Sequence, residues 1–367
     1  MVRALGTAPE RPGGGDRSID PELARLLRAV VGQSASDLHL TVGRPPMIRV
    51  DGRLGPCLGE PILPAASIAR MLESVLDPEK RQVLRAQGQV DLAVSLTGTG
   101  RFRLNAYRQM GSPAAAFRAV SDTIPTTRDI GLPPEVERVA QLPSGLVLFV
   151  GPTGSGKSTT QAALIGSVNA STPCHILTIE DPVEFFHRAE VALVTQREVG
   201  TDVGTFAEGL RAALREDPDL ILLGEMRDDE SVSIALTLAE TGHLVFATLH
   251  SNDAAHAVDR ILDTFQSDRR SQVRGQLAGV LRAVVSQRLA PRLGGGRLAA
   301  FEVLMVNDAV RNLIREGKNH QLRNVVATGR SSGMRTMEQS LNEMVAAGLI
   351  SVSAALALTL YPKEIVL

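Results

Sequence analysis

The sequence predicts an α/β protein in two parts: a small α+β domain, then a larger core built on a parallel sheet. Its 367 residues suffice for two domains, at roughly 100–200 residues each. Up to about residue 120, helical and strand patterns follow one another, whereas after Leu142 runs that are apolar throughout alternate with amphipathic helices. Such runs are typical of strands covered on both faces, and their alternation with helices is typical of parallel order.

The first domain is expected to span residues 21–120 and to have a core of its own. Apolar residues at helical spacing predict helices over 21–31 and 68–76. Alternating patterns and short apolar stretches predict strands over 37–42, 47–50, 90–96 and 102–107, with a turn at 43–46. Ahead of this domain, residues 1–20 include a Gly/Pro-rich stretch and are expected to form a disordered lead.

The second domain is expected to span residues 135–367, after a linker with prolines and threonines over 121–134. Four apolar runs predict its strands, at 146–150, 176–179, 220–223 and 244–248. A helical pattern follows the first run at 159–168, and the tail beyond Asp308 is mostly helical.

The composition of the chain argues against several kinds of partner and indicates a cellular compartment. The net charge of −1 gives no field that would draw nucleic acid or an anionic membrane, and aromatics make up only 3% with no Trp, so we expect no nucleic acid partner. The two cysteines, Cys57 and Cys174, exclude a four-cysteine zinc site and suit a reducing cytosol. The uncharged run 349–362 is shorter than the roughly 20 residues of a spanning helix, so any membrane role is expected to come through a partner.

A glycine-rich segment between the strand at 146–150 and the helix at 159–168 matches GxxxxGK[ST] in full. Its glycines let successive backbone N–H groups point at phosphate oxygens, and the helix behind them adds positive potential. Lys157 is expected to reach the β- and γ-phosphates, and the Ser158 hydroxyl to ligate Mg²⁺, so ATP and Mg²⁺ are the predicted cofactors. The candidate nucleotide-binding residues are Gly151, Pro152, Thr153, Gly154, Ser155, Gly156, Lys157, Ser158 and Thr159.

Two groups of acids follow predicted strands. The strand at 220–223 leads through Gly224 to Glu225, a carboxylate that can hold the Mg²⁺ shell or orient water. The strand at 176–179 leads to a second acidic group, Glu180, Asp181 and Glu184. By chemistry alone, any of these three could polarise the attacking water.

Two histidines and two arginines complete the candidates. His243 and His250 flank the strand at 244–248, where a histidine could sense the γ-phosphate by a hydrogen bond, although a lone histidine is more often structural. Arg103 and Arg118 lie in the first domain. An arginine delivered from another domain or subunit stabilises charge in a loose phosphoryl-transfer transition state, but most arginines are merely solvated.

Taken together, these segments resemble the secretion ATPase superfamily of type II secretion and type IV pili, and within it the PilT-type retraction ATPases. The similarity runs from about Ser36 onward, and its most specific pieces are 35–40, 151–160, 178–184, 224–228 and 241–250. Residues 309–318 resemble the family's C-terminal segment associated with retraction, with Val310 in place of Ile. After His250 the chain reads Ser251-Asn252-Asp253, where the family more often has Thr-Asn-Ser.

The resemblance implies a cytoplasmic hexameric motor that powers retraction of type IV pili and twitching motility. Each chain would carry an N-terminal PAS-like domain and a RecA-like ATPase domain, and the ring would act on an inner-membrane platform protein, with a paralogous ATPase as a further candidate partner. The site roles implied are nucleotide and Mg²⁺ binding for Lys157 and Ser158, water activation for Glu184, the Walker B acid for Glu225, the His-box contact for His250 with His243, and inserted arginines for Arg103 and Arg118.

Three alternatives stay open. One is an extension or type II secretion ATPase without its zinc module, which the segment at 309–318 and the lack of a longer N-terminal part argue against. Another is a catalytically silent ring partner, although such a subunit need not keep Lys157, Glu184, Glu225 and His250. The third is a nucleic-acid translocase, since RecA-like cores are shared, but charge and scarce aromatics argue against it.

Overall fold

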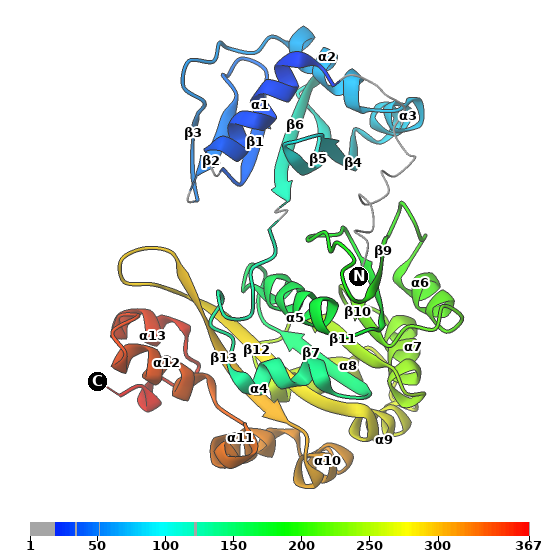
Figure 1. Ribbon diagram of the computed structural model, residues 1–367, viewed down its shortest axis with the longest axis vertical. Helices are drawn as coiled ribbons and strands as arrows, with labels where there is room; N and C mark the ends of the chain where they lie inside the picture. Colours follow the sequence, from blue (N-terminus) through cyan, green and yellow to red (C-terminus); the bar gives the residue numbers. More distant parts are fainter. Residues whose placement is uncertain (1–18, 34, 51, 121–122, 367) are drawn as a thin grey trace, which may run out of the picture. The chain divides into compact units, whose positions relative to one another are not determined.

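The computed structural model describes residues 19–33, 35–50, 52–120 and 123–366. The chain divides into two compact units between Thr123 and Ile124 (Figure 1). Most of the predicted disordered lead lies outside the described residues, as do positions 121–122 of the predicted linker.

The first unit is built on an antiparallel sheet of six strands among its described residues, in the order β3-β2-β1-β6-β5-β4. The helices and strands expected from the sequence are present, and β3, α3 and β6 are additions to them. The elements are α1 (Pro21–Gly32), β1 (Asp37–Leu40), β2 (Met47–Val50), β3 (Arg53–Pro56), α2 (Ala65–Val75), α3 (Pro78–Gln87), β4 (Gln89–Leu96), β5 (Gly100–Gln109) and β6 (Ser112–Val120).

Helix α1 packs its apolar stripe into the core of this unit. Leu23, Leu26, Leu27 and Val30 recur at helical spacing and are fully or almost fully buried with the sheet's inner residues. The helix begins where the side chain of Asp20 accepts the backbone N–H groups of the first turn. The first unit therefore has a hydrophobic core of its own.

The second unit is a seven-stranded sheet among its described residues, in the order β13-β12-β7-β11-β10-β8-β9, with helices on both faces (Figure 1). All neighbouring strands run parallel except β12 and β13, so the expectation of a parallel sheet is correct for all but this edge pair. The elements up to β13 are α4 (Pro134–Glu137), β7 (Gly145–Val150), α5 (Lys157–Ser171), β8 (His175–Glu180), β9 (Leu193–Glu198), α6 (Phe206–Ala213), β10 (Leu220–Leu223), α7 (Asp229–Glu240), β11 (Leu244–Leu249), α8 (Ala254–Asp263), α9 (Arg270–Val280), β12 (Leu281–Pro291) and β13 (Arg297–Met305).

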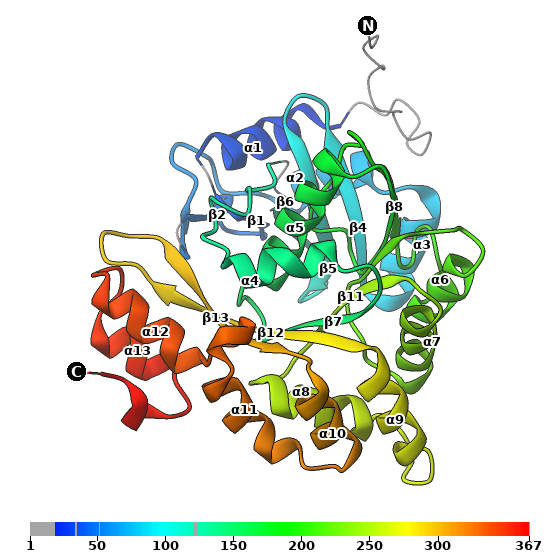
Figure 2. The same cartoon turned by 60° about the horizontal axis from the view of Figure 1, so that its bottom comes forward.

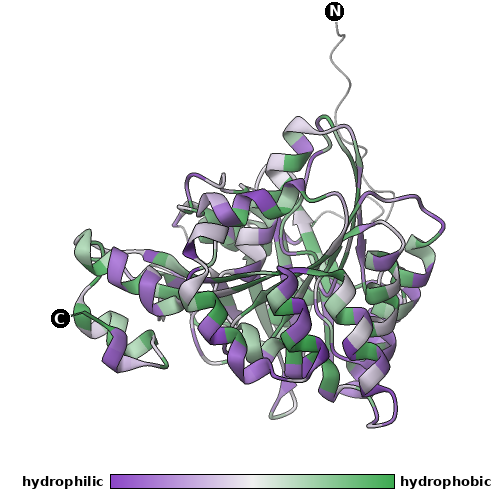
Figure 3. Ribbon diagram, turned by 90° about the horizontal axis from the view of Figure 1, so that it is seen from below, coloured by the Kyte–Doolittle hydropathy of each residue, from purple (hydrophilic) through white to green (hydrophobic). Residues whose placement is uncertain are grey.

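The path of the chain through the sheet decides which helices cover which face. From β7 to β8 the chain moves one way across the sheet, and from β9 through β10 and β11 to β12 it returns. Because crossover connections between parallel strands are right-handed, the change of direction puts α5 on one face and α6 to α9 on the other (Figure 2). Apolar residues line the strands between these layers, and polar residues lie on the outer faces of the helices (Figure 3).

A helical tail follows β13, as the sequence predicts. Its longer helices are α10 (Asp308–Arg315), α11 (Leu322–Thr328), α12 (Met337–Ala346) and α13 (Val352–Leu358). Helices α10 and α11 join the core on the α8 side of the sheet, whereas α12 and α13 form a separate small cluster with Ala290 and Ala300 of the edge strands. Across the described part of the chain, no helix combines the length and the apolarity needed to cross a membrane.

Candidate nucleotide site

Parallel strands of the second unit bring the predicted site segments to one edge of the sheet. Strand β7 ends at the glycine-rich loop, β10 at Gly224 and Glu225, β11 at His250, and β8 at the second acidic group. Because these strands are parallel neighbours, their carboxyl ends meet at the same edge, where ligands bind in open α/β sheets.

The glycine-rich loop fits closely against β12. Gly151 and Gly156 have φ values of 148° and 89°, and α5 begins directly after Gly156. A Cβ at Gly151 would lie 2.5 Å from the carbonyl oxygen of Gln287, and one at Gly156 would lie 2.7 Å from the Gln287 side-chain nitrogen. The buried Gln287 also accepts a hydrogen bond of 2.8 Å from the Thr160 hydroxyl, so this side chain supports the loop from below.

Lys157 is buried at the base of the loop. Its ammonium group donates to the carbonyl oxygens of Gly151, at 2.9 Å, and Pro152, at 3.1 Å. Burial lowers the pKa of Lys157, while the negative charges of Glu225 and Glu184 act to raise it, so both carboxylates lie within electrostatic reach of the ammonium. The nearby Ser155 hydroxyl oxygen is buried with no protein partner, which suits a loop that surrounds phosphate oxygens.

Glu225 stands between two cationic or titratable groups. Its carboxylate accepts a hydrogen bond of 2.7 Å from Arg227 and lies 3.6 Å from Nε2 of His250. The Gly224 N–H donates to the carbonyl of Ile179 at 2.8 Å, which fixes the strand end that carries the carboxylate. An open cavity of about 820 Å³ adjoins Glu225 and His250.

The second acidic group separates into a buried and two exposed carboxyls. Glu180 is buried, and burial raises its pKa against hydrogen bonds from Thr178, at 2.7 Å, and from the Glu184 N–H, at 3.4 Å. Asp181 and Glu184 are exposed. Of the three acids that the sequence leaves open, Glu184 is the one whose charge acts on Lys157.

Within its own chain, His243 does not lie at this edge. It precedes β11, whereas His250 follows the strand, and six residues at roughly 3.3 Å each separate the two ends. Its Nδ1 lies 3.0 Å from the carbonyl oxygen of Leu238 and 3.2 Å from the Thr241 hydroxyl. Within its own chain, His243 therefore packs against the end of α7 instead of the loop.

Arg103 and Arg118 are neighbours in the first unit. They face each other in register across β5 and β6. Arg118 donates a hydrogen bond of 2.9 Å to Asp37, whose other oxygen accepts from Ser36. Burial acts to raise the pKa of Asp37, but these hydrogen bonds outweigh it and the pKa is lowered. The two arginines thus form a pair on one face of the first sheet.

The comparisons with known proteins agree with this arrangement. The family model described as type II/IV secretion system protein matches residues 14–295. The chain belongs to this family. A crystal structure described as the pilus retraction motor PilT with bound ADP superimposes with a TM-score of 0.87 at 43% identity, covering 93% of this chain and 98% of that one.

Two curated relatives of this secretion ATPase carry names that point the same way. Type IV pilus retractation ATPase PilT of Pseudomonas aeruginosa is 45% identical over 330 residues, which cover 90% of this chain and 96% of the relative. A twitching motility protein of Neisseria gonorrhoeae is 47% identical over 311 residues, covering 84% of this chain and 83% of the relative. The described relatives thus match nearly the whole chain in both units.

Sequence reasoning missed two supporting residues of this secretion ATPase. Gln287 supports the glycine-rich loop, and Arg227 pairs with Glu225. Gln287 carries no sequence signal, because it lies on β12, far along the sequence from the loop that it contacts. Arg227 could have been found, since it lies two residues after the acid on a strand end.

Proposed function

We propose that the chain is an ATP-hydrolysing motor that powers retraction of type IV pili and thereby twitching motility. The observation that carries the proposal is the meeting of Lys157, Glu225 and Glu184 at one sheet edge, on a glycine-rich loop that precedes a helix. The names of the relatives supply the process that ATP hydrolysis would drive.

Nucleotide binding falls to the residues of the loop. The backbone N–H groups over 151–159 and the ammonium of Lys157 would hold the phosphates, and the unpaired Ser155 hydroxyl fits a phosphate oxygen. The donor set of Ser158 and Glu225 suits Mg²⁺, a hard cation that prefers oxygen ligands. When bound, Mg²⁺ would neutralise charge that develops on the phosphates.

Hydrolysis needs a base, an orienting group and a positive charge. The exposed Glu184 would orient and deprotonate the attacking water, while His250, next to Glu225, would contact the γ-phosphate region. Arg103 and Arg118 would stabilise the transition state from the first unit of the same or of a neighbouring chain. His243, which lies at the other end of β11, would act in this scheme only on a neighbouring subunit.

Membership of the secretion ATPase family supports a proposal for the larger assembly. We propose a hexameric ring of chains, each with a PAS-like domain at 21–120, a linker at 121–134 and a RecA-like domain at 135–367. The strand order β3-β2-β1-β6-β5-β4 in the first unit supports a PAS-like description. In α10, the exposed Ala309, Asn312 and Arg315 recur every third residue on one face, where a platform protein at the inner membrane could bind.

Steady-state ATP hydrolysis by the purified protein, with its mass measured in parallel, tests the proposal. The wild type should turn over ATP as a hexamer in the presence of Mg²⁺. Glu184→Gln should lower kcat by at least about 100-fold, and Lys157→Ala should abolish nucleotide binding. Glu190→Gln, an exposed acid in the same connection, serves as the control.

Two results would redirect the proposal. A wild type that binds ATP but hydrolyses it no faster than Glu184→Gln would make the chain a silent ring partner. If cells with residues 309–318 replaced keep both ATPase activity and pilus retraction, the extension or secretion alternative gains the advantage.

A further inference from the structure

We propose that Glu302 is a positioning residue that holds the loop bearing His250 in its working place at the nucleotide site. This inference rests on the proposed ATPase function and adds a residue outside every motif discussed above. Glu302 lies on β13, one strand beyond β12, at the edge of the sheet.

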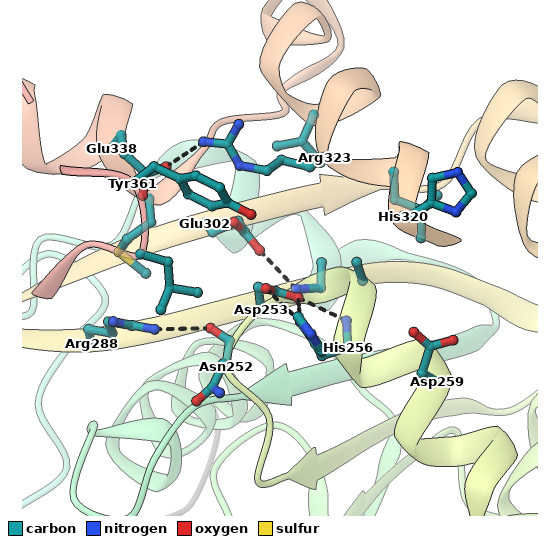
Figure 4. A pocket seen from close by; sticks show the side chains of 16 residues that line it. Asn252, Asp253, His256, Asp259, Arg288, Glu302, His320, Arg323, Glu338 and Tyr361 are labelled. Atoms are coloured by element: carbon teal, nitrogen blue, oxygen red, sulfur yellow. Dashed lines mark hydrogen bonds and ion pairs between the residues drawn. The ribbon is translucent and has the colours of Figure 1, made fainter. Parts of the chain in front are cut away.

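Side chains of β12 and β13 hold the loop that follows β11. Glu302 Oε1 accepts a hydrogen bond of 2.8 Å from the backbone N–H of Ala254, the first residue of α8 (Figure 4). Ser286, which faces Glu302 in register across β12 and β13, donates to the carbonyl of Asn252 at 3.4 Å. Arg288 donates to the same carbonyl at 3.3 Å. Three side chains of one hairpin thus hold the segment that begins two residues after His250.

Strand β12 therefore supports the site from both of its faces. Gln287 points to the α5 side and holds the glycine-rich loop, whereas Ser286 and Arg288 point to the α8 side and hold the His250 loop. Strand β12 also pairs directly with β7, so the strand that carries these supports is hydrogen-bonded to the strand that leads into the glycine-rich loop. Among the side chains that hold the His250 loop, Glu302 makes the shortest hydrogen bond.

Glu302 faces a cavity of about 240 Å³ between α8 and the helical tail (Figure 4). The carboxylate is buried, and it accepts its hydrogen bond from the uncharged backbone N–H of Ala254. Burial, together with the charges of Asp253 and Glu338, raises the pKa of Glu302 to about 7, with the Ala254 hydrogen bond and Arg323 acting against the rise. The titratable and charged groups that line the cavity around it are Asp253, His256, Asp259, Arg288, His320, Arg323, Glu338 and Tyr361.

The cavity also supplies a matched control. Glu338, on α12, is as deeply buried as Glu302, but it accepts from Thr359, at 2.6 Å, and pairs with Arg323. It therefore shares the surroundings of Glu302 without touching the His250 loop. A general loosening of the cavity would affect both variants, whereas loss of the loop support would affect only one.

The experiment compares Glu302→Ala, Glu302→Gln and Glu338→Ala in the full-length protein, by ATP turnover and by backbone hydrogen exchange. Glu302→Ala should lower kcat about tenfold with KM for ATP within about twofold, since the loop acts on the γ-phosphate edge and not on the rest of the nucleotide. Glu302→Gln keeps an oxygen acceptor for Ala254 and should stay within about twofold of the wild type.

Exchange measured without nucleotide separates this inference from the function it rests on. Amides at 250–256 should exchange faster in Glu302→Ala alone, whether or not the protein hydrolyses ATP. Equal effects of Glu302→Ala and Glu338→Ala on turnover and exchange, or a Glu302→Gln variant as impaired as Glu302→Ala, would overturn the positioning role. A wild type without ATPase activity but with the expected exchange pattern would instead count against the proposed function.

Discussion

Packing and backbone conformation together constrain the two outer glycines of the glycine-rich loop, whereas backbone conformation alone constrains the glycine between them. Gly151 and Gly156 combine a positive φ with close contact to Gln287. Gly154 has a φ of 78° but no atom within 4 Å of the position that a Cβ would occupy. Backbone conformation alone therefore restricts Gly154, whereas packing against β12 restricts the other two as well.

Alanine substitutions test this distinction. Gly154→Ala should weaken nucleotide binding modestly, because a non-glycine residue at such a φ costs about 1–2 kcal/mol. Gly156→Ala should weaken it more than Gly154→Ala does, since its Cβ would also displace the Gln287 side-chain amide, which the Thr160 hydroxyl holds in place. Titration with a fluorescent ADP analogue measures both, and adding Gln287→Ala to Gly156→Ala should recover part of the loss. Equal losses in the two single variants would contradict the packing argument.

Glu302 makes stability depend on pH. In the folded chain its pKa is raised from the ordinary 4.5 to about 7, so the folded state holds a proton that the unfolded state has released. Stability relative to Glu302→Gln should be unaffected below about pH 4.5, fall between about pH 4.5 and 7, and level off above, with a total change of at most about 3 kcal/mol. Thermal unfolding of both proteins from pH 4 to 8 measures the difference, and parallel curves would count against a buried, titrating Glu302.

At the level of single residues, the sequence predicts the candidate site residues better than the residues that hold their loops in place. Lys157, Ser158 and Glu225 stand in local patterns, a loop before a helix and an acid after a strand, so their neighbours along the chain reveal them. Gln287 and Glu302 act across strands that are far apart in sequence, and no local pattern marks a side chain that holds another loop. His243 and His250 lie at opposite ends of β11, so within one chain only His250 is at the edge that carries the glycine-rich loop.

Among the elements, buried strands were the easiest to predict. Strands β7, β10 and β11 are buried at every position and, apart from Thr248, consist of apolar residues and glycine, so their residue types alone indicate a buried strand. Strand β12 was not predicted, because Ser286, Gln287 and Arg288 interrupt its apolar pattern. These three residues contact the glycine-rich loop or the His250 loop. Helix α3 was not predicted, because it has no fully buried residue and its two partly buried apolar residues, Val83 and Leu84, are adjacent and form no helical repeat.

Helix α12 depends on a reciprocal hydrogen-bonded pair at its start. The Thr336 hydroxyl accepts from the Gln339 N–H, and the Gln339 side chain accepts from the Thr336 N–H. Thr336→Ala should destabilise this helix by about 1 kcal/mol. Hydrogen exchange at residues 337–346 should rise accordingly, while Thr328→Ala, whose hydroxyl bonds only within α11, should leave α12 unchanged. Unchanged protection of α12 in Thr336→Ala would mean that packing alone maintains it.

For the whole molecule, the proposed role of the two arginines distinguishes between the nucleotide of their own chain and that of a neighbouring chain. Arg103 and Arg118 belong to the first unit, and Lys157, Glu184 and Glu225 to the second. In a ring, an arginine can act on its own chain's nucleotide or on a neighbour's. Arg103 is the better probe, because Arg118 also supports Asp37.

Mixed rings decide between the two cases. Arg103→Ala and Glu184→Gln should each be nearly inactive alone, and co-expression should restore measurable turnover if the arginine acts on a neighbouring chain, because some sites then combine an intact Glu184 with an intact Arg103. The ATPase rate of purified mixed rings measures this, with rings of each single variant as controls. Rings that stay as inactive as the single variants would place Arg103 on its own chain's nucleotide.

The contacts of Leu358 and Glu364 have a practical consequence for imaging this protein in living cells. The Glu364 carboxylate pairs with Arg323, the Glu364 carbonyl accepts from Asn342, and Arg288 binds both the end of α13 and the His250 loop. A fluorescent reporter placed after Glu364 would lie next to these contacts, of which Arg288 also holds the His250 loop. The exposed glycine turn at 294–296, between β12 and β13, has open space around each of its residues and is the better place to insert a short label.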